Sequence, residues 1–222
     1  MPYYGEPAYT PATASNLVLA KAYGLLAVLL GATSLGTTYG MAHPSLITGH
    51  YLLTIILFFG LGLGSQFATR VSLPFGYAMA LAFSLVAGAY IAPEILTFLR
   101  FPGGLGILQD SLGTTTVAIL GISVYALTTR RDFSHLRGFL GVGLIVLLVG
   151  LVANIFLHLS ALQMALAGMG ALLFSALLMV DTNRLRDTVD PEQSLALVLS
   201  VYLDIFNLFQ FVLELFAGTS RN

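Results

Sequence analysis

Long apolar stretches alternate along this chain with short breaks that contain charges, proline or glycine. A helix needs roughly 20 mostly apolar residues to cross the hydrocarbon core of a bilayer. Seven stretches approach this length: Leu17–Gly40, Leu46–Ala68, Pro74–Ile91, Ile107–Thr129, Leu136–Leu157, Ala161–Thr182 and Pro191–Ala217. Strands of a membrane barrel would instead alternate in polarity over ~10 residues. The pattern predicts an all-α, integral membrane bundle of seven transmembrane helices, with the first span retained as a helix.

The break before the last stretch carries a helix-start signal, Asp190-Pro191-Glu192-Gln193. Asp190 is expected to be the N-cap residue and Pro191 the first helical residue, since proline is favoured there. Gln193 is expected to complete a capping box by bonding back to the N-cap backbone. We expect the seventh helix to begin at Pro191.

Composition supports the membrane assignment and narrows the function. The chain is 57% hydrophobic and 9% charged, whereas soluble domains carry about 25% charged residues. The net charge of −1 indicates no nucleic-acid partner. The absence of cysteine excludes disulfides and thiolate metal sites. No metalloprotease, serine-hydrolase or P-loop motif is present, so we do not expect an enzyme.

Lysine and arginine positions predict the orientation. Because cytoplasmic loops are enriched in basic residues, we place the N-terminus in the cytoplasm and the C-terminus outside. Basic residues on the cytoplasmic side would then be Lys21, Arg70, Arg130, Arg131, Arg137, Arg184 and Arg186. Only Arg100 and Arg221 would lie outside. Residues 1–16, which lack apolar periodicity, are expected to form a flexible cytoplasmic tail, and residues 17–222 a single transmembrane domain.

Two aspartates inside the apolar stretches are the first candidate site. Asp181 lies near the cytoplasmic end of the sixth span and Asp204 lies within the seventh. These spans run antiparallel and are joined by a short loop, so their carboxylates could approach each other. Two close carboxylates cannot both ionise cheaply, and the pair could share a proton. Such a pair could act as a pH sensor, a proton relay or a Ca²⁺ ligand set; alternatively, Asp181 only marks the membrane interface.

A polar stripe accompanies Asp204 on the last helix. At 100° per residue its members cluster within about 80°, with Asp204 on the flank. The stripe consists of Ser200, Asn207, Gln210 and Glu214. It predicts a polar cavity or interhelical hydrogen bonds, although Glu214 could also lie at the outer interface.

Four segments resemble the Bax inhibitor family, most closely its bacterial YccA branch. They are Val201–Phe209 (VYLDIFNLF), Val180–Asn183 (VDTN), Tyr125–Ser134 (YALTTRRDFS) and Gly150–Leu157 (GLVANIFL). The resemblance implies a seven-helix fold around a central helix in the bacterial inner membrane. It also implies a pH-sensitive calcium leak channel whose aspartate pair matches Asp181 and Asp204. An arginine latch of that family matches Arg70 best.

The YccA branch implies an alternative, because it is described as restraining the membrane ATP-dependent protease FtsH, which could grip the tail Met1–Ser15. This chain departs from the family in two ways. Glu214 stands where members often have arginine, which puts any salt bridge there in doubt, and the branch can lack the aspartate pair that this chain has. The sequence leaves open whether the chain is a cation leak pathway or a protease modulator without transport.

Overall fold

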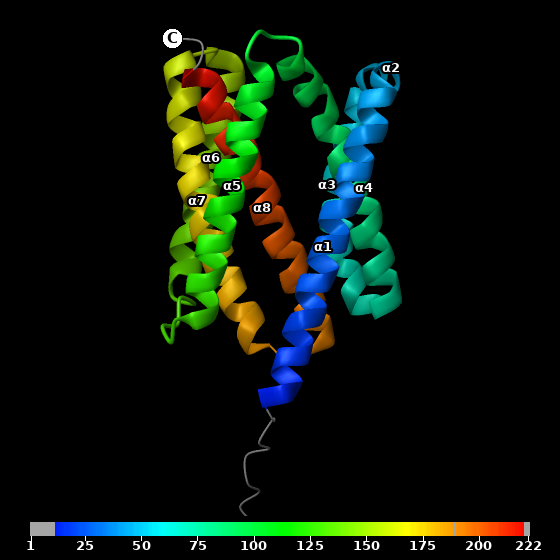
Figure 1. Ribbon diagram of the computed structural model, residues 1–222, viewed down its shortest axis with the longest axis vertical. Helices are drawn as coiled ribbons and strands as arrows, with labels where there is room; N and C mark the ends of the chain where they lie inside the picture. The colour runs from blue at the N-terminus through cyan, green and yellow to red at the C-terminus, as the bar shows by residue number, and fades with distance from the viewer. Residues whose placement is uncertain (1–11, 189, 220–222) are drawn as a thin grey trace, which may run out of the picture.

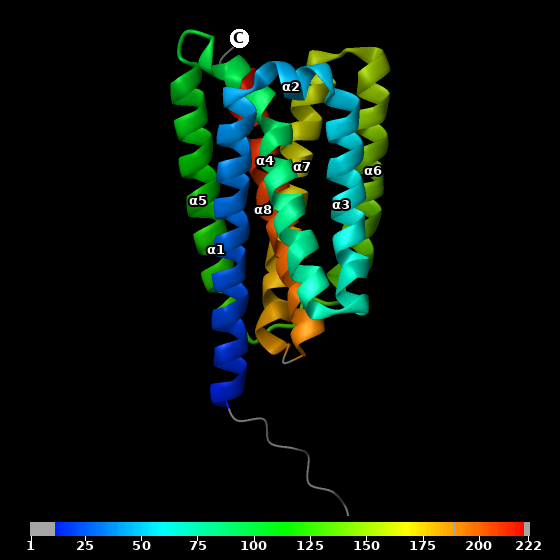
Figure 2. The ribbon, with the colours of Figure 1, turned by 90° about the vertical axis from the view of Figure 1, so that its right-hand side faces the viewer.

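The polypeptide forms a bundle of α-helices joined by short connections (Figures 1 and 2). The computed structural model describes residues 12–188 and 190–219. Its helices are α1 (Ala12–Ala42), α2 (Pro44–Gly49), α3 (Tyr51–Val71), α4 (Leu73–Leu99), α5 (Gly104–Thr128), α6 (Leu136–Leu157), α7 (Ser160–Asp187) and α8 (Pro191–Thr219). Seven of the described helices, all except α2, are long and apolar enough to cross a membrane. The predicted all-α bundle of seven transmembrane helices is therefore confirmed.

The predicted second span, Leu46–Ala68, is wrong at its start. Proline at the first position opens the short helix α2, and His50 then interrupts the helical path with φ −121° and ψ 33°. The spanning part begins only afterwards, at Leu52. The short helix α2 therefore lies between the C-terminal end of α1 and the N-terminal end of α3, across that end of the bundle (Figure 2).

The predicted third span, Pro74–Ile91, ends too early. Helix α4 continues to Leu99 with Pro93 inside it. Proline removes one backbone hydrogen bond and usually ends a helix in water, but transmembrane helices tolerate it because neighbouring helices and side chains compensate. The extension carries Glu94 into the bundle instead of into a loop.

The start of α8 follows the predicted N-cap. The Glu192 backbone N–H donates to Asp190 Oδ1 at 3.0 Å, and α8 begins at Pro191. Gln193 Oε1 accepts a 2.7 Å hydrogen bond from the Thr188 hydroxyl, and the capping box predicted for Gln193 stays a prediction. At the opposite end of the chain, α1 begins at Ala12, five residues before the predicted span; residues 1–11 of the predicted tail lie outside the described part.

Helix α8 is the centre of the bundle. It contacts α1, α3 and α4 on one side and α5 and α7 on the other (Figure 1). It is also the most buried of the spans. Large apolar residues elsewhere point outward, such as Val117 on α5 and Phe156 on α6, as expected where lipid is the solvent. The membrane-crossing part of α8 is therefore surrounded largely by other helices.

Two glycines allow α1 and α4 to pack closely. A Cβ atom at Gly36 would collide with the backbone of Leu85, and one at Gly88 would collide with the backbone of Thr33. Small residues at such crossings bring membrane helices together without a water-driven hydrophobic force. This crossing fixes the position of α4, which forms one wall of the site described below.

Side chains of α7 secure the C-terminal end of α5. Asn183 Nδ2 donates to the Ala126 carbonyl at 3.1 Å, and Arg186 donates to the carbonyls of Ala126 and Thr129. A cation near a helix C-terminus satisfies otherwise unpaired carbonyls.

In the loop between α5 and α6, the backbone N–H and the hydroxyl of Ser134 both donate hydrogen bonds to the Asp132 carboxylate. These bonds stabilise the charged form and lower the pKa of Asp132.

Candidate functional site

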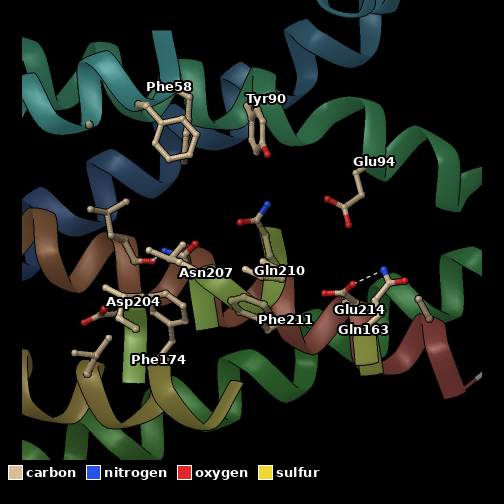
Figure 3. A pocket seen from close by; sticks show the side chains of 18 of the residues that line it. Phe58, Tyr90, Glu94, Gln163, Phe174, Asp204, Asn207, Gln210, Phe211 and Glu214 are labelled. Atoms are coloured by element: carbon tan, nitrogen blue, oxygen red, sulfur yellow. Dashed lines mark hydrogen bonds between the residues drawn. The ribbon is translucent and has the colours of Figure 1, made fainter. Parts of the chain in front are cut away.

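A cavity of about 1600 Å³ lies beside α8, enclosed by residues of α3, α4, α6 and α7 (Figure 3). Its lining follows α8 from Ser200 to Gly218. At the rise of an α-helix this stretch is ~27 Å long, close to the ~30 Å thickness of a bilayer hydrocarbon core. The cavity therefore extends along most of the membrane-crossing length of the central helix.

The charged side chains that line the cavity are all acidic. They are Glu94 on α4, Asp181 on α7, and Asp204 and Glu214 on α8. Among the described residues of the lining there is no lysine, arginine or histidine. Acidic groups within low-dielectric walls concentrate a negative potential, which attracts cations and repels anions.

Asp204 occupies the interior of the bundle. The residue is only 5% exposed, and its Oδ2 atom has no hydrogen-bond partner among the described residues. A buried carboxylate oxygen without a partner costs free energy unless a proton, a water molecule or a cation compensates it. Asp204 also lies close enough to Asp181 for their charges to interact.

Asp181 is held by an ion pair that the sequence analysis did not predict. Arg184 Nη1 lies 3.3 Å from Asp181 Oδ1, one turn further along α7. The Ser200 hydroxyl of α8 lies beside the same carboxylate, and Arg137 of α6 acts on it electrostatically. The structure thus brings Asp181 and Asp204 to one cavity. No hydrogen bond joins their two carboxyl groups in the described part of the chain, so proton sharing stays a prediction.

Arg70, the candidate latch, lies elsewhere in this structure. Its guanidinium carbon is 5.6 Å from the centre of the Phe67 ring. It borders a smaller hollow with Asp190, Glu192 and Gln193, near the start of α8. The described ion pairs join Arg70 to neither Asp181 nor Asp204, and the latch role stays a prediction.

The polar stripe of the last helix faces the cavity. Ser200, Asn207, Gln210 and Glu214 all belong to its lining, together with Asp204. Figure 3 shows Asp204, Asn207, Gln210 and Glu214 in succession along α8. Asn207 Nδ2 donates to the Leu203 carbonyl of its own helix at 2.8 Å, so its side-chain oxygen stays available to a ligand.

Glu94 and Gln163 are cavity residues that the sequence analysis missed. Gln163 of α7 donates from Nε2 to Glu214 Oε1 at 2.5 Å, and Glu94 projects from α4 toward the same region (Figure 3). Because the third span was predicted to end at Ile91, Glu94 was placed outside the bundle. The tolerance of membrane helices for proline was the signal that could have extended this span past Pro93.

Aromatic rings form the apolar part of the walls. Phe58 of α3 stacks on Tyr90 of α4 with a centroid distance of 4.8 Å, and Phe174 of α7 stacks on Phe211 of α8 at 5.7 Å. Figure 3 places these two pairs on opposite sides of the polar stripe.

Within the described residues, no three histidine, cysteine or acidic side chains gather into a group that could hold a metal ion. The acidic groups are instead spaced along the cavity.

The fold and the cavity define a multi-pass membrane protein with a central buried helix and an acidic interior. Residues 15–222 match the family described as inhibitor of apoptosis-promoting Bax1. This chain therefore belongs to the Bax inhibitor family, as the resemblance in its motifs predicted.

Bacterial relatives match nearly the whole chain. A protein of Vibrio cholerae named as an uncharacterized membrane protein is 29% identical over 214 residues, covering 94% of this chain and 92% of its own length. A protein of Escherichia coli K12 named modulator of FtsH protease YccA is 31% identical over 220 residues, covering 96% and 95%. Its counterpart in Escherichia coli CFT073, with the same identity and coverage, is named inner membrane protein YccA.

Proposed function

We propose that the chain forms a pH-sensitive leak pathway for cations, chiefly Ca²⁺, across a bacterial inner membrane. The observation that carries the proposal is the cavity along α8, which has four acidic side chains and no basic one among its described lining residues. The name of an Escherichia coli relative supports the location. In this role the protein binds and releases an ion and catalyses no reaction.

Carboxylate and amide oxygens along the cavity suit a hard cation. Ca²⁺ prefers oxygen ligands from carboxylates, carbonyls and water in flexible geometries. Asp204 supplies a buried carboxylate oxygen without a protein partner, and Asn207 and Gln210 supply amide oxygens further along α8. A passing cation would compensate the buried charge at Asp204 while it occupies the cavity.

Asp181 and Asp204 are the proposed pH-sensitive groups. The charged groups that act on this pair are Arg184 of α7 and Arg137 of α6, and the Ser200 hydroxyl of α8 lies beside Asp181. Protonation of Asp181 would remove its ion pair with Arg184, and protonation of Asp204 would remove its attraction for a cation. Either protonation changes the electrostatic potential along the cavity and therefore its attraction for cations.

Calcium flux into liposomes tests this proposal. Purified protein is placed in vesicles that contain a calcium dye, and influx is measured from mildly acidic to mildly alkaline pH. We expect pH-dependent influx that Asp204→Asn lowers and makes less dependent on pH. The matched control is Asp110→Asn, at an exposed position of α5 outside the cavity. Influx that is indifferent both to pH and to Asp204→Asn contradicts the proposal.

A second candidate function, modulation of the FtsH protease, is supported by one specific finding. The Escherichia coli K12 relative, 31% identical over nearly the full length of both chains, is named for it. We infer that this chain could restrain a membrane protease of that class, with Met1–Ser15 as the segment that the protease would grip.

Deletion of Met1–Ser15 and overexpression of the intact chain test this second function. We expect the intact chain to slow the turnover of membrane substrates of the protease and to co-purify with it, and the deletion to weaken both effects. Asp204→Asn is the control, because it should leave this activity intact while lowering flux. If neither overexpression of the intact chain nor deletion of Met1–Ser15 changes the turnover of the protease's substrates, the proposed modulation of the protease is rejected.

A further inference from the structure

The outer end of the cavity contains a second acidic pair, distant from Asp181 and Asp204. Glu94 of α4 and Glu214 of α8 project into the cavity from different walls (Figure 3). They are close enough for their charges to interact. Both lie near the helix ends opposite the arginine-rich loops, which is the outer side in the predicted orientation.

No described basic side chain compensates this pair. The charged group that acts on Glu94 is Glu214, a like charge, and the described lining of the cavity has no basic residue. Two like charges inside a membrane protein are costly unless a proton or a cation lies between them. The pair therefore needs a counter-charge that the described protein residues do not supply.

Neighbouring side chains add ligands suited to a divalent cation. Gln163 must direct its amide nitrogen at Glu214, because an ionised carboxylate only accepts hydrogen bonds. This leaves Gln163 Oε1 available as a neutral oxygen ligand. Two carboxylates and one amide oxygen, completed by water, match the ligand chemistry of Ca²⁺ and not that of a thiolate- or imidazole-preferring metal.

A second observation in the same cavity also calls for a compensating group. Asp204, deeper along α8, is 5% exposed, lines this cavity and has an Oδ2 atom without a partner. From Asp204 to Glu214 the axial distance is ~15 Å along the helix, and Asn207 and Gln210 lie between them on the same lining. An ion bound at the outer pair would therefore have a polar route to an unsatisfied carboxylate.

We propose that Glu94 and Glu214, with Gln163, form an outer binding site that captures a hard divalent cation, Ca²⁺, before it moves along the cavity toward Asp204. This inference rests on the proposed function, because it assigns the outer entrance of the same pathway. It places the selectivity for divalent over monovalent cations at the outer pair, where two charges converge.

Calcium binding to the purified full-length protein in detergent tests the site without requiring transport. The probe is radioactive Ca²⁺ at equilibrium, with Na⁺ and K⁺ as competitors. We expect Glu94→Gln and Glu214→Gln each to weaken Ca²⁺ binding about tenfold, because each removes one charged ligand. Asp110→Asn and Glu192→Gln, both exposed and outside the cavity, are the matched controls.

A further variant, Glu214→Lys, distinguishes a loss of Ca²⁺ binding at the site from a loss caused by misfolding. Its ammonium group would stand opposite Glu94 and replace the cation, so we expect thermal stability to be kept while Ca²⁺ binding is lost. The same variants are then measured in liposomes, where Glu94→Gln and Glu214→Gln should slow influx from the outer side.

The outcomes separate this inference from the pathway itself. Unchanged Ca²⁺ binding in both glutamine variants, with influx that still depends on Asp204, overturns the outer site and leaves the pathway standing; a pair that only shares a proton gives this result. Binding that depends on Glu94 and Glu214 in a protein without influx supports the outer site and overturns the leak pathway.

Discussion

At the scale of single residues, Asp204 is a buried carboxylate that costs the fold free energy. It is buried in the central helix with an unpartnered carboxylate oxygen, although buried charges are normally paired. The Tyr202 hydroxyl two residues earlier is by contrast 2.6 Å from Thr33 Oγ1 and ties α8 to α1. Tyr202 is thus bonded to a neighbouring helix, whereas Asp204 lines the cavity with one oxygen that has no described partner.

Replacement of Asp204 by an apolar residue should raise stability and remove flux. Replacement of a buried ion pair by apolar residues of similar volume often leaves stability unchanged or increases it by about 1–4 kcal/mol. A buried carboxylate oxygen without a partner lacks even the compensation that such a pair provides. We expect Asp204→Leu to keep or raise the thermal unfolding temperature in detergent, with Asp110→Leu as control, and to abolish calcium influx. A clear drop in unfolding temperature would show that Asp204 has a structural partner.

At the scale of elements, close packing of α1 on α4 holds the wall that carries Glu94. Gly36 and Gly88 lie at this crossing, where an added Cβ would meet backbone atoms of the facing helix. Backbone cannot move aside as a flexible side chain can, so the helices themselves would have to separate. Pro93 lies further along the same helix and does not end it.

Gly88→Ala should therefore destabilise the bundle, by about 1–3 kcal/mol as for other overpacked sites. The control is Gly121→Ala on α5, where no atom lies within 4 Å of the added Cβ; there alanine should be neutral or stabilising, since it favours helix by about 1 kcal/mol. Thermal unfolding in detergent measures both variants. Equal unfolding temperatures would mean that the α1–α4 crossing relaxes freely.

For the whole molecule, the ends of the bundle differ in charge. The loops at one end and the helix termini beside them carry Arg70, Arg130, Arg131 and Arg137 with Arg184 and Arg186, whereas Arg100 lies at the other end. Helices α1, α3 and α4 on one side and α5, α6 and α7 on the other surround α8 (Figure 1). The orientation of this assembly in the membrane stays a prediction from the positive-inside rule.

Single cysteines can determine the orientation, because the chain has no natural cysteine. We expect Phe101→Cys, in the α4–α5 loop, to react with a membrane-impermeant maleimide in intact cells. Ser134→Cys, in the α5–α6 loop, should react only after the cells are permeabilised. The reverse labelling pattern would place the N-terminus outside and move the proposed outer site to the cytoplasmic side.

The sequence by itself determined the number and character of the spans, since each apolar stretch must match the bilayer thickness and satisfy its own backbone hydrogen bonds. It also identified the polar stripe from helical periodicity, and its motifs indicated the family that the comparison confirmed. These properties are local, because they depend on residues within one helix.

Only the tertiary structure decided which polar groups share a space. It paired Asp181 with Arg184 and Ser200, left Arg70 beside Phe67, and brought Glu94 opposite Glu214. These partnerships depend on how closely helices cross and on where a helix continues past a proline, which the apolar pattern does not record. Hydrophobicity fixes that a helix lies in the membrane, whereas packing between helices fixes what each of its polar side chains meets.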